Sequence, residues 1–159
     1  MKHLSWNCRG LGNPEAIHEL RKIVKQEGPD LLFVMETKIR AKRVEILKHT
    51  LGFSGCFAVN SGGLSGGLGL YWSSDISVDL KSYSFGHIDV VARKGGSPSH
   101  EWRFTGFYGA PRSEDRYHSW NYLRRLHAIS HQAWLCLGDF NETQHATEHF
   151  SRAQRAEWQ

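Results

Sequence analysis

Cysteine, proline and long apolar runs are all scarce in this chain of 159 residues. The three cysteines, at positions 8, 56 and 136, are odd in number and show no C-x-x-C spacing. This argues against a disulfide framework and against a zinc site, and we expect buried reduced thiols. No apolar run is long enough to cross a bilayer, and the N-terminus lacks the apolar core of a signal peptide. These absences predict a soluble intracellular protein, nuclear or cytoplasmic, with no membrane partner.

The chain carries a small net positive charge. The formal net charge is +4 at pH 7 and the isoelectric point is about 9.1. Such a mild excess permits a polyanionic partner without requiring one. Hydrophobic residues make up 40% of the chain, which is enough for a packed core and excludes wholesale disorder. The length favours a single domain.

Apolar periodicity predicts that the chain opens with alternating strands and helices. The predicted elements are strands at 4–8 and 31–35 and helices at 15–27 and 41–51. Gly28 and Gly52 follow the last periodic residues of the two helices, where glycine commonly ends a helix. This order predicts a sheet with helices packed over it, an α/β fold.

The middle of the chain reads as strands separated by glycine, serine and asparagine. The predicted strands are 56–59, 67–72, 76–83, 87–93 and 102–108. In the third of them, Ile76, Val78 and Leu80 alternate with polar residues, which predicts that they face inward. The glycine run at 62–67 lacks the Lys-Ser/Thr of a P-loop and opens no helix, so we interpret it as a flexible link.

A helix is predicted at 115–131, before the last apolar run of the chain. Its apolar residues recur every three positions and predict a buried side made of Trp120, Leu123, Leu126 and Ile129. Trp134 then begins a nearly continuous apolar run, which predicts a strand buried on both faces. Such a strand needs neighbours on both sides, but residues 143–159 are polar, so we expect a C-terminally truncated domain at 1–142 and a tail outside the core.

Polar residues stand at the predicted strand ends, where the sites of layered α/β proteins are found. Asp139 and Asn141, two residues apart on extended chain, would project together, unless they form an Asx turn. The other members are Asn7, Glu36 and Tyr108. Together they supply two carboxylates, two amides and a phenol. One carboxylate can bind a hard cation and the other can act as a base, so the set suits phosphodiester hydrolysis with Mg²⁺.

Each of these residues also has a plainer interpretation. Asn7 could cap a turn, Glu36 could be a solvated residue before the next helix, and Tyr108 could be a core ring with its hydroxyl at the surface. The basic residues Lys38, Arg40, Lys42 and Arg43 could be a solvated helix face or could contact a DNA backbone. The joint pattern favours chemistry over these alternatives.

Together, these segments resemble the endonuclease/exonuclease/phosphatase superfamily, and within it the endonuclease domain of plant non-LTR (LINE-type) retrotransposons. The segments are Ser5-Trp6-Asn7-Cys8-Arg9-Gly10, Met35-Glu36-Thr37-Lys38, Gly66-Gly67-Leu68-Gly69-Leu70-Tyr71-Trp72, Phe104-Thr105-Gly106-Phe107-Tyr108-Gly109 and Gly138-Asp139-Phe140-Asn141-Glu142. The resemblance implies a four-layer α/β/β/α sandwich of two sheets flanked by helices. It also implies a Mg²⁺-dependent hydrolase, with Mn²⁺ as a substitute, that binds and nicks DNA.

The resemblance also implies a role for each residue. Glu36 would be the metal ligand, and Asn7 would help to position the metal or the phosphate. Asp139 would activate the attacking water, Asn141 would stabilise the phosphate, and Tyr108 would contact the scissile phosphate. We expect a monomer with no obligate protein partner.

Two departures from the family pattern weaken the expected activity. Arg9 stands where some members carry an acid that assists the metal, and no Ser-Asp-His segment follows residue 142. His145 and His149 lack the preceding Ser-Asp and are not assigned. We therefore expect an inactive or impaired endonuclease, with low stability and solubility. The alternatives are a degenerate remnant that binds nucleic acid weakly, or a phosphomonoesterase of the same superfamily.

Overall fold

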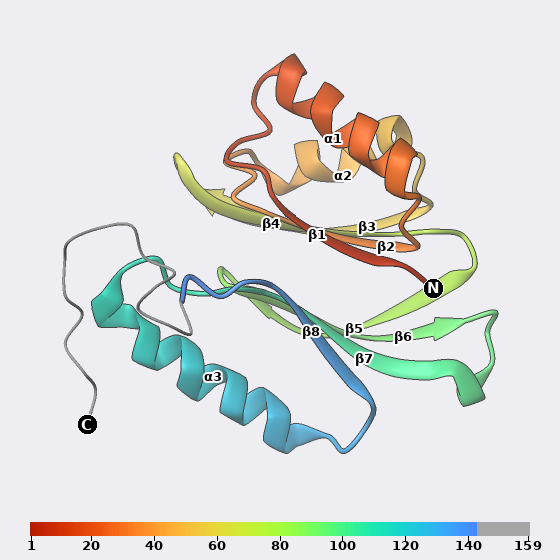
Figure 1. Cartoon of the computed structure of the whole chain (residues 1–159), viewed down its shortest axis with the longest axis vertical. Helices are drawn as coiled ribbons and strands as arrows, with labels where there is room; N and C mark the ends of the chain where they lie inside the picture. Colours follow the sequence, from red (N-terminus) through yellow and green to blue (C-terminus); the bar gives the residue numbers. More distant parts are fainter. Residues whose placement is uncertain (143–159) are drawn as a thin grey trace.

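The chain forms two four-stranded sheets packed face to face, with helices on both outer sides (Figure 1). The computed structural model describes residues 1–142, so the predicted tail and its two histidines lie outside the described residues. In chain order the elements are β1 (His3–Asn7), α1 (Pro14–Glu27), β2 (Leu31–Met35), α2 (Ala41–Leu51), β3 (Gly55–Gly62), β4 (Ser65–Trp72), β5 (Ile76–Ser84), β6 (His87–Lys94), η1 (Pro98–His100), β7 (Glu101–Tyr108), η2 (Ser113–Asp115), α3 (Arg116–Ile129) and β8 (Trp134–Asp139). The predicted four-layer arrangement of mixed sheets and flanking helices is confirmed.

Each sheet mixes parallel and antiparallel pairs. The strand orders are β1-β2-β4-β3 and β5-β6-β7-β8. The parallel pairs are β1 with β2 and β7 with β8; the others are antiparallel. Parallel strands end at the same edge of their sheet, so Asn7 lies opposite Met35 and Tyr108 lies opposite Asp139. This register gathers the polar strand ends.

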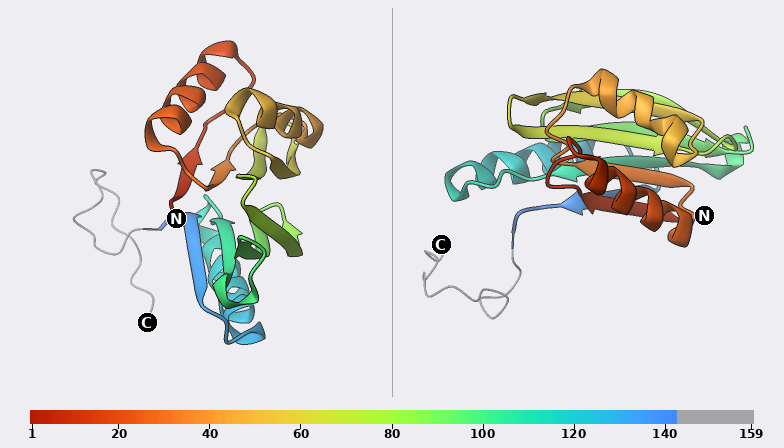
Figure 2. Two further views of the ribbon diagram at one scale, coloured as in Figure 1. Left: turned by 90° about the vertical axis from the view of Figure 1, so that its right-hand side faces the viewer. Right: turned by 90° about the horizontal axis from the view of Figure 1, so that it is seen from above.

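Two views of the chain place α1 and α2 over one sheet and α3 over the other (Figure 2). Helix α1 begins because the Asn13 side chain accepts a hydrogen bond from the Ala16 amide at 2.7 Å, and Pro14 suits the first turn. Gly28 and Gly52 end α1 and α2 with left-handed φ angles of 56° and 82°, as the sequence predicts. None of the helices within 1–142 is long and apolar enough to cross a membrane.

Strand β2 is fully buried and belongs to both apolar cores. Leu31, Phe33 and Met35 face the other sheet, whereas Leu32 and Val34 face the helices. Successive side chains of a strand point to opposite faces, and both faces of this one are covered. This explains why its sequence is a continuous apolar run rather than an alternating one.

Replacing Gly106 with alanine is expected to destabilise the chain by about 1–3 kcal/mol, as overpacking does. A Cβ there would lie 2.2 Å from Cδ2 of Phe33, across the interface between the sheets. Gly62→Ala is the matched control, since its Cβ would meet only Ser65 Oγ at 4.0 Å. Urea unfolding measures both variants, and equal unfolding midpoints would contradict the tight contact.

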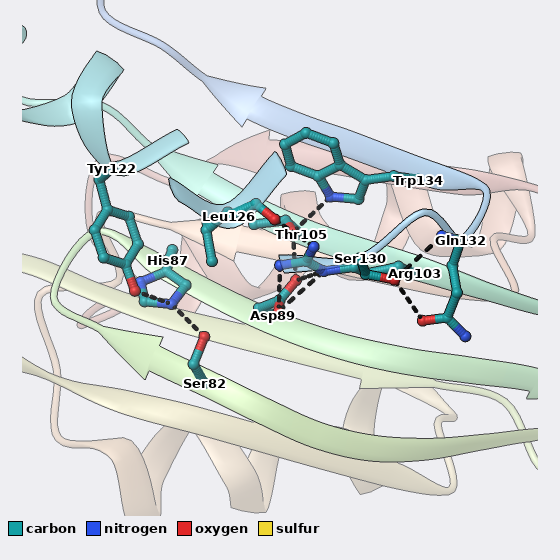
Figure 3. A network of polar contacts seen from close by, with 10 residues as sticks. All are labelled: Ser82, His87, Asp89, Arg103, Thr105, Tyr122, Leu126, Ser130, Gln132 and Trp134. Atoms are coloured by element: carbon teal, nitrogen blue, oxygen red, sulfur yellow. Dashed lines mark hydrogen bonds and ion pairs between the residues drawn. The ribbon is translucent and has the colours of Figure 1, made fainter. Parts of the chain in front are cut away.

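A buried polar network ties α3 to the second sheet (Figure 3). Asp89 and Arg103 are 2% and 3% exposed and are joined by Nη2–Oδ2 and Nε–Oδ1 hydrogen bonds of 2.9 and 3.0 Å. The same guanidinium donates to the Leu126 carbonyl of α3. Thr105 donates to Asp89 at 2.6 Å and accepts from the Trp134 indole at 2.8 Å. Asp89 and Arg103 are therefore hydrogen-bonded to each other, and the network ties them to Leu126 and Thr105 as well.

His87 holds a second contact between α3 and the sheet (Figure 3). Its Nε2 lies 3.0 Å from the hydroxyls of both Tyr122 and Ser82, and its Nδ1 lies 2.6 Å from that of Ser84. Burial lowers the pKa of His87 to about 4, although the negative charge of Asp89 acts to raise it. The imidazole is therefore neutral at physiological pH and has a structural role.

Three expectations about burial were wrong. Strand β8 lies at a sheet edge, paired only with β7 among the described strands, so it is half-buried and Leu135 is 36% exposed. In α3, Trp120 and Ile129 are 40% and 72% exposed. Steps of three residues fall about 60° short of a turn, so these two lie on opposite sides of the buried residues between them. Leu80 is 38% exposed, beside a register shift in β5.

The three cysteines are free and partly buried. Burial raises the pKa of each thiol to about 12, so the thiols stay protonated and unreactive at neutral pH. The expectation of reduced thiols holds, although none of them is fully buried. Of the glycine run at 62–67, only Gly63 lies in the turn between β3 and β4, and Gly66 and Gly67 belong to β4; all three take positive φ angles.

Candidate active site

The side chain of Asn7 joins the two sheets at the point where their strands end. Its Nδ2 donates to Glu36 Oε1 at 2.9 Å and to Asp139 Oδ2 at 3.2 Å. Asn7 ends β1 and Glu36 directly follows β2, whereas Asp139 ends β8 of the other sheet. Two carboxylates from different sheets therefore share one amide nitrogen. The predicted convergence of strand ends occurs.

Glu36 lies at the centre of this arrangement. The hydroxyl of Tyr108 also donates to Oε1, at 2.9 Å, and Lys38 Nζ lies 3.6 Å from Oε2. Partial burial raises the pKa of Glu36, but the hydrogen bonds from Asn7 and Tyr108 and the charge of Lys38 outweigh it, so the pKa lies below its usual value. The group is a carboxylate at neutral pH, as a metal ligand must be. It is not the solvated residue of the plainer interpretation.

Tyr108 is a hydrogen-bond donor at this site. Burial, the hydrogen bond to Glu36 and the charge of that carboxylate raise the pKa of Tyr108 to about 12. The phenol thus keeps its proton throughout the physiological range. A phenol has one O–H, so Tyr108 can donate to another anionic oxygen, such as one of a phosphate, by turning that O–H away from Glu36.

Asp139 and Asn141 lie together, but through a turn rather than extended chain. Asn141 takes a positive φ of 52°, and its backbone N–H donates to Asp139 Oδ1 at 2.9 Å. This is the Asx turn that the sequence left as an alternative. The Asn141 side chain donates to the Gly109 carbonyl at 2.7 Å, which fixes it beside Tyr108. The Asx turn is therefore what places Asn141 at the site next to Asp139.

Two glycines allow β7 and β8 to approach this closely. A Cβ on Gly138 would lie 1.8 Å from the Phe107 carbonyl oxygen, and one on Gly109 would lie 2.2 Å from that of Phe140. Real Cβ atoms do not come that close to backbone. The sequence motifs contain both glycines, but their role depends on the pairing of β7 with β8, which sequence reasoning did not identify.

The basic residues near the site have separate roles. Arg9 is exposed at φ 49°, and its backbone N–H donates to Asn7 Oδ1 at 3.1 Å, which orients the amide. Lys38 pairs with Glu36, a contact that neither interpretation of the basic cluster, a solvated face or a contact to a DNA backbone, included. Arg43 donates to the Gly12 carbonyl at 3.4 Å. Two positively charged segments therefore flank the carboxylates.

The oxygen ligands at the site fit a hard divalent cation. Within residues 1–142 there is no group of three or more histidine, cysteine, aspartate or glutamate residues that could hold a metal, which argues against a zinc cage there. Mg²⁺ instead uses one or two carboxylates and completes its shell with water and phosphate. Glu36 and Asp139 supply two such carboxylates around a single amide.

Tyr108→Phe is expected to raise the pKa of Glu36 and to lower stability by about 1 kcal/mol, since one hydrogen bond to a carboxylate is lost. A lowered carboxyl pKa stabilises the fold above the ordinary pKa, and this stabilisation is lost as pH falls through the folded-state value. The variant should therefore lose less stability on acidification below pH 5. NMR titration of the Glu36 carboxyl measures the change, with Tyr83→Phe as control. An unchanged pKa would contradict the hydrogen bond.

A cleft of about 480 Å³ opens beside Tyr108, and we call it the Tyr108 cleft. Its walls are the β3–β4 turn, the β5–β6 turn and the loop after β7. The lining residues are Gly62, Ser65, Gly66, Phe85, Gly86, Tyr108, Gly109, Ala110, Pro111 and Ser119. Tyr108 therefore contacts Glu36 on one side and lines this cleft on the other.

Comparison with solved structures shows the same fold. An AP endonuclease from Leishmania major, LMAP, gives a TM-score of 0.64 at 17% identity, over 94% of this chain and 57% of its own. TDP2 from Caenorhabditis elegans gives 0.63 at 18%, over 95% of this chain and 49% of its own. The endonuclease domain of TRAS1, a telomere-specific non-LTR retrotransposon, gives 0.58 at 14%, over 89% and 59%.

The chain thus spans about half the length of the TDP2 structure. The comparison with curated protein sequences found no match. The sequence model of the Endonuclease/Exonuclease/phosphatase family matches residues 4–159, which includes every residue of the site. The strand ends, the shared amide and this match together show that the chain belongs to the Endonuclease/Exonuclease/phosphatase family.

Proposed function

We propose that this chain is part of a metal-dependent phosphodiesterase-type endonuclease that nicks DNA. One observation carries the proposal: the Asn7 amide holds Glu36 and Asp139, from two different sheets, within 3.2 Å of a single nitrogen. Two carboxylates held this close repel each other, and a bound cation would relieve that repulsion. The similarity to the TRAS1 endonuclease domain and to an AP endonuclease supports DNA as the substrate.

The proposed roles are those that the family resemblance implies, and the contacts at the site support them. Glu36 holds a divalent cation, which when bound neutralises phosphate charge and polarises its oxygens. Asp139, with a free lone pair beside its bonds to Asn7 and Asn141, accepts the proton of the attacking water. Tyr108 keeps its proton and turns its single O–H from Glu36 to a phosphate oxygen as charge grows there.

Within this proposal, the finer role is target nicking in retrotransposition. The support is the set of motifs that resembles plant LINE-type endonucleases, together with the structural similarity to the endonuclease domain of TRAS1. Impaired activity is part of the proposal. Arg9 replaces an assisting acid, and no histidine among residues 1–142 hydrogen-bonds to Glu36 or Asp139 in the interactions above.

Removing the metal is the direct test. The full chain is incubated with supercoiled plasmid in Mg²⁺, in Mn²⁺ and in EDTA, and open-circular product is followed by gel. We expect slow nicking in either metal and none in EDTA, because phosphate charge is then no longer neutralised. Nicking that continues in EDTA would contradict the proposal, as would a folded chain that does not nick in either metal.

Two alternative functions have assays of their own. A phosphomonoesterase would use the same carboxylates and would hydrolyse p-nitrophenyl phosphate under the same conditions. A non-catalytic remnant would bind DNA in a salt-sensitive manner through the basic segments that contain Arg9 and Lys38, without turnover. Assays of the monoester and of DNA binding on the same preparation separate the three functions.

A further inference from the structure

The Tyr108 cleft lies directly beside the proposed reaction centre, and none of its lining residues is charged. Its volume of about 480 Å³ is in the range of small-ligand pockets. Tyr108 belongs to both places, since its hydroxyl donates to Glu36 at 2.9 Å. Tyr108 thus connects the place where a phosphate would bind Glu36 with a cleft that can receive the sugar and base of a nucleotide.

Hydrogen bonds hold the walls of the cleft in place. The Gly66 carbonyl accepts from the Lys38 amide at 2.9 Å, and the Gly86 carbonyl accepts from the Tyr108 amide at 2.7 Å. On the third side, the Ala110 amide donates to Ser119 of α3 at 2.9 Å. Each wall is thus tied to a residue of the site or to α3, so the cleft is preformed.

Phe85 is the unusual member of the lining. It sits in the turn between β5 and β6 with 73% of its surface exposed. The neighbouring exposed aromatic of the same hairpin, Tyr83, packs against the ring of Phe57 at 5.1 Å and does not line the cleft. A large exposed apolar ring in a preformed cleft beside a reaction centre is a contact surface rather than part of the core.

We propose that Phe85 is a stacking platform for an unpaired nucleobase next to the scissile phosphate. This rests on the proposed nuclease function. Bases stack on exposed aromatic rings irrespective of sequence, and the absence of carboxylates from the lining leaves the backbone of the nucleotide unrepelled. A base inside a duplex cannot reach a ring in this way, because it must first leave its stack. The preferred substrate is therefore DNA that is single-stranded or distorted at the cut.

The test compares two oligonucleotides of equal length and charge. One is a fluorescent single strand with normal bases, and the other has tetrahydrofuran in place of every nucleoside. Anisotropy titrations in EDTA and at fixed salt measure binding without cleavage. The full chain is expected to bind the base-bearing strand at least about fivefold more tightly, the lower end for one base stacked on an aromatic ring. Equal binding of the two strands would overturn the proposal.

Variants assign the preference to Phe85. Phe85→Ala and Phe85→Leu should bring the ratio close to one, and Phe85→Trp should keep it. Tyr83→Ala, an exposed aromatic of the same hairpin, is the matched control and should also keep it. Because Phe85 is mostly exposed, its leucine variant should unfold at the same temperature as the unaltered chain. A preference that persists in both the alanine and leucine variants would overturn the assignment.

The readout is independent of nicking. A chain that shows a Phe85-dependent base preference but does not nick would support the platform and reject the nuclease function. A chain that nicks in Mg²⁺ but binds both strands equally would reject the platform and leave the nuclease function standing.

Discussion

Replacing Asp139 with alanine is expected to lower Mg²⁺-dependent plasmid nicking by about two to four orders of magnitude, which is the usual contribution of a positioned general base. The variant leaves the attacking water without its acceptor. It also removes one of the two carboxylates that the Asn7 amide holds, at 3.2 Å. The rate of nicking, followed against the EDTA background, measures the loss.

Two further variants make this result specific. Asp139→Asn keeps the shape of the side chain but removes the charge and the basic oxygen, so it should lose as much activity as the alanine variant. Asp79→Ala removes the same charge from an exposed position on β5 that pairs with Lys81, and its nicking should be unchanged. Undiminished nicking by the Asp139 variants would show that another group activates the water.

Replacing Asp89 with alanine is expected to destabilise the fold by about 3–5 kcal/mol, because a buried charge then loses its partner. Arg103 is 3% exposed and directs its guanidinium at Asp89 (Figure 3). Thr105 loses its acceptor in the same change. Urea unfolding, followed by tryptophan fluorescence, measures the difference in free energy.

The double variant Asp89→Leu, Arg103→Met is the control, since it removes both charges and leaves neither unpaired. It should cost less than either single change, as replacement of whole buried pairs by apolar residues does. A loss below about 1 kcal/mol for Asp89→Ala, typical of an exposed pair, would contradict the buried geometry.

Periodicity predicted most of the elements because local patterns define them. Helix α2 and strand β2 occupy the predicted residues, and Gly28 and Gly52 end their helices as expected. The errors arose where a partner decides burial. β8 resembles a central strand in composition, but its partner lies on one side only among the described residues. Neighbours in space cannot be deduced from the composition of a strand alone.

The convergence of the candidate residues was predictable from the sequence, but the geometry of their contacts was not. Asn7, Glu36, Tyr108 and Asp139 were all identified from strand ends, because parallel strands end at a common edge. That Asn7 bridges the carboxylates follows from the packing of one sheet on the other. Lys38 was missed because its pairing with Glu36 needs the positive φ angles at both residues, and nothing in their identity requires those.

The order of the strands along the chain has a consequence for how activity arises. All strands of the first sheet lie within residues 3–72, and all described strands of the second lie within 76–139, with a single crossing between them. Asn7 and Glu36 come from the first segment, and Tyr108 and Asp139 from the second. Neither segment alone holds these four side chains, so the candidate site forms only when the second segment has been made and packs on the first. Two separately made segments would regain the site only by docking, which makes the break at 73–75 the natural position for dividing the chain into two pieces.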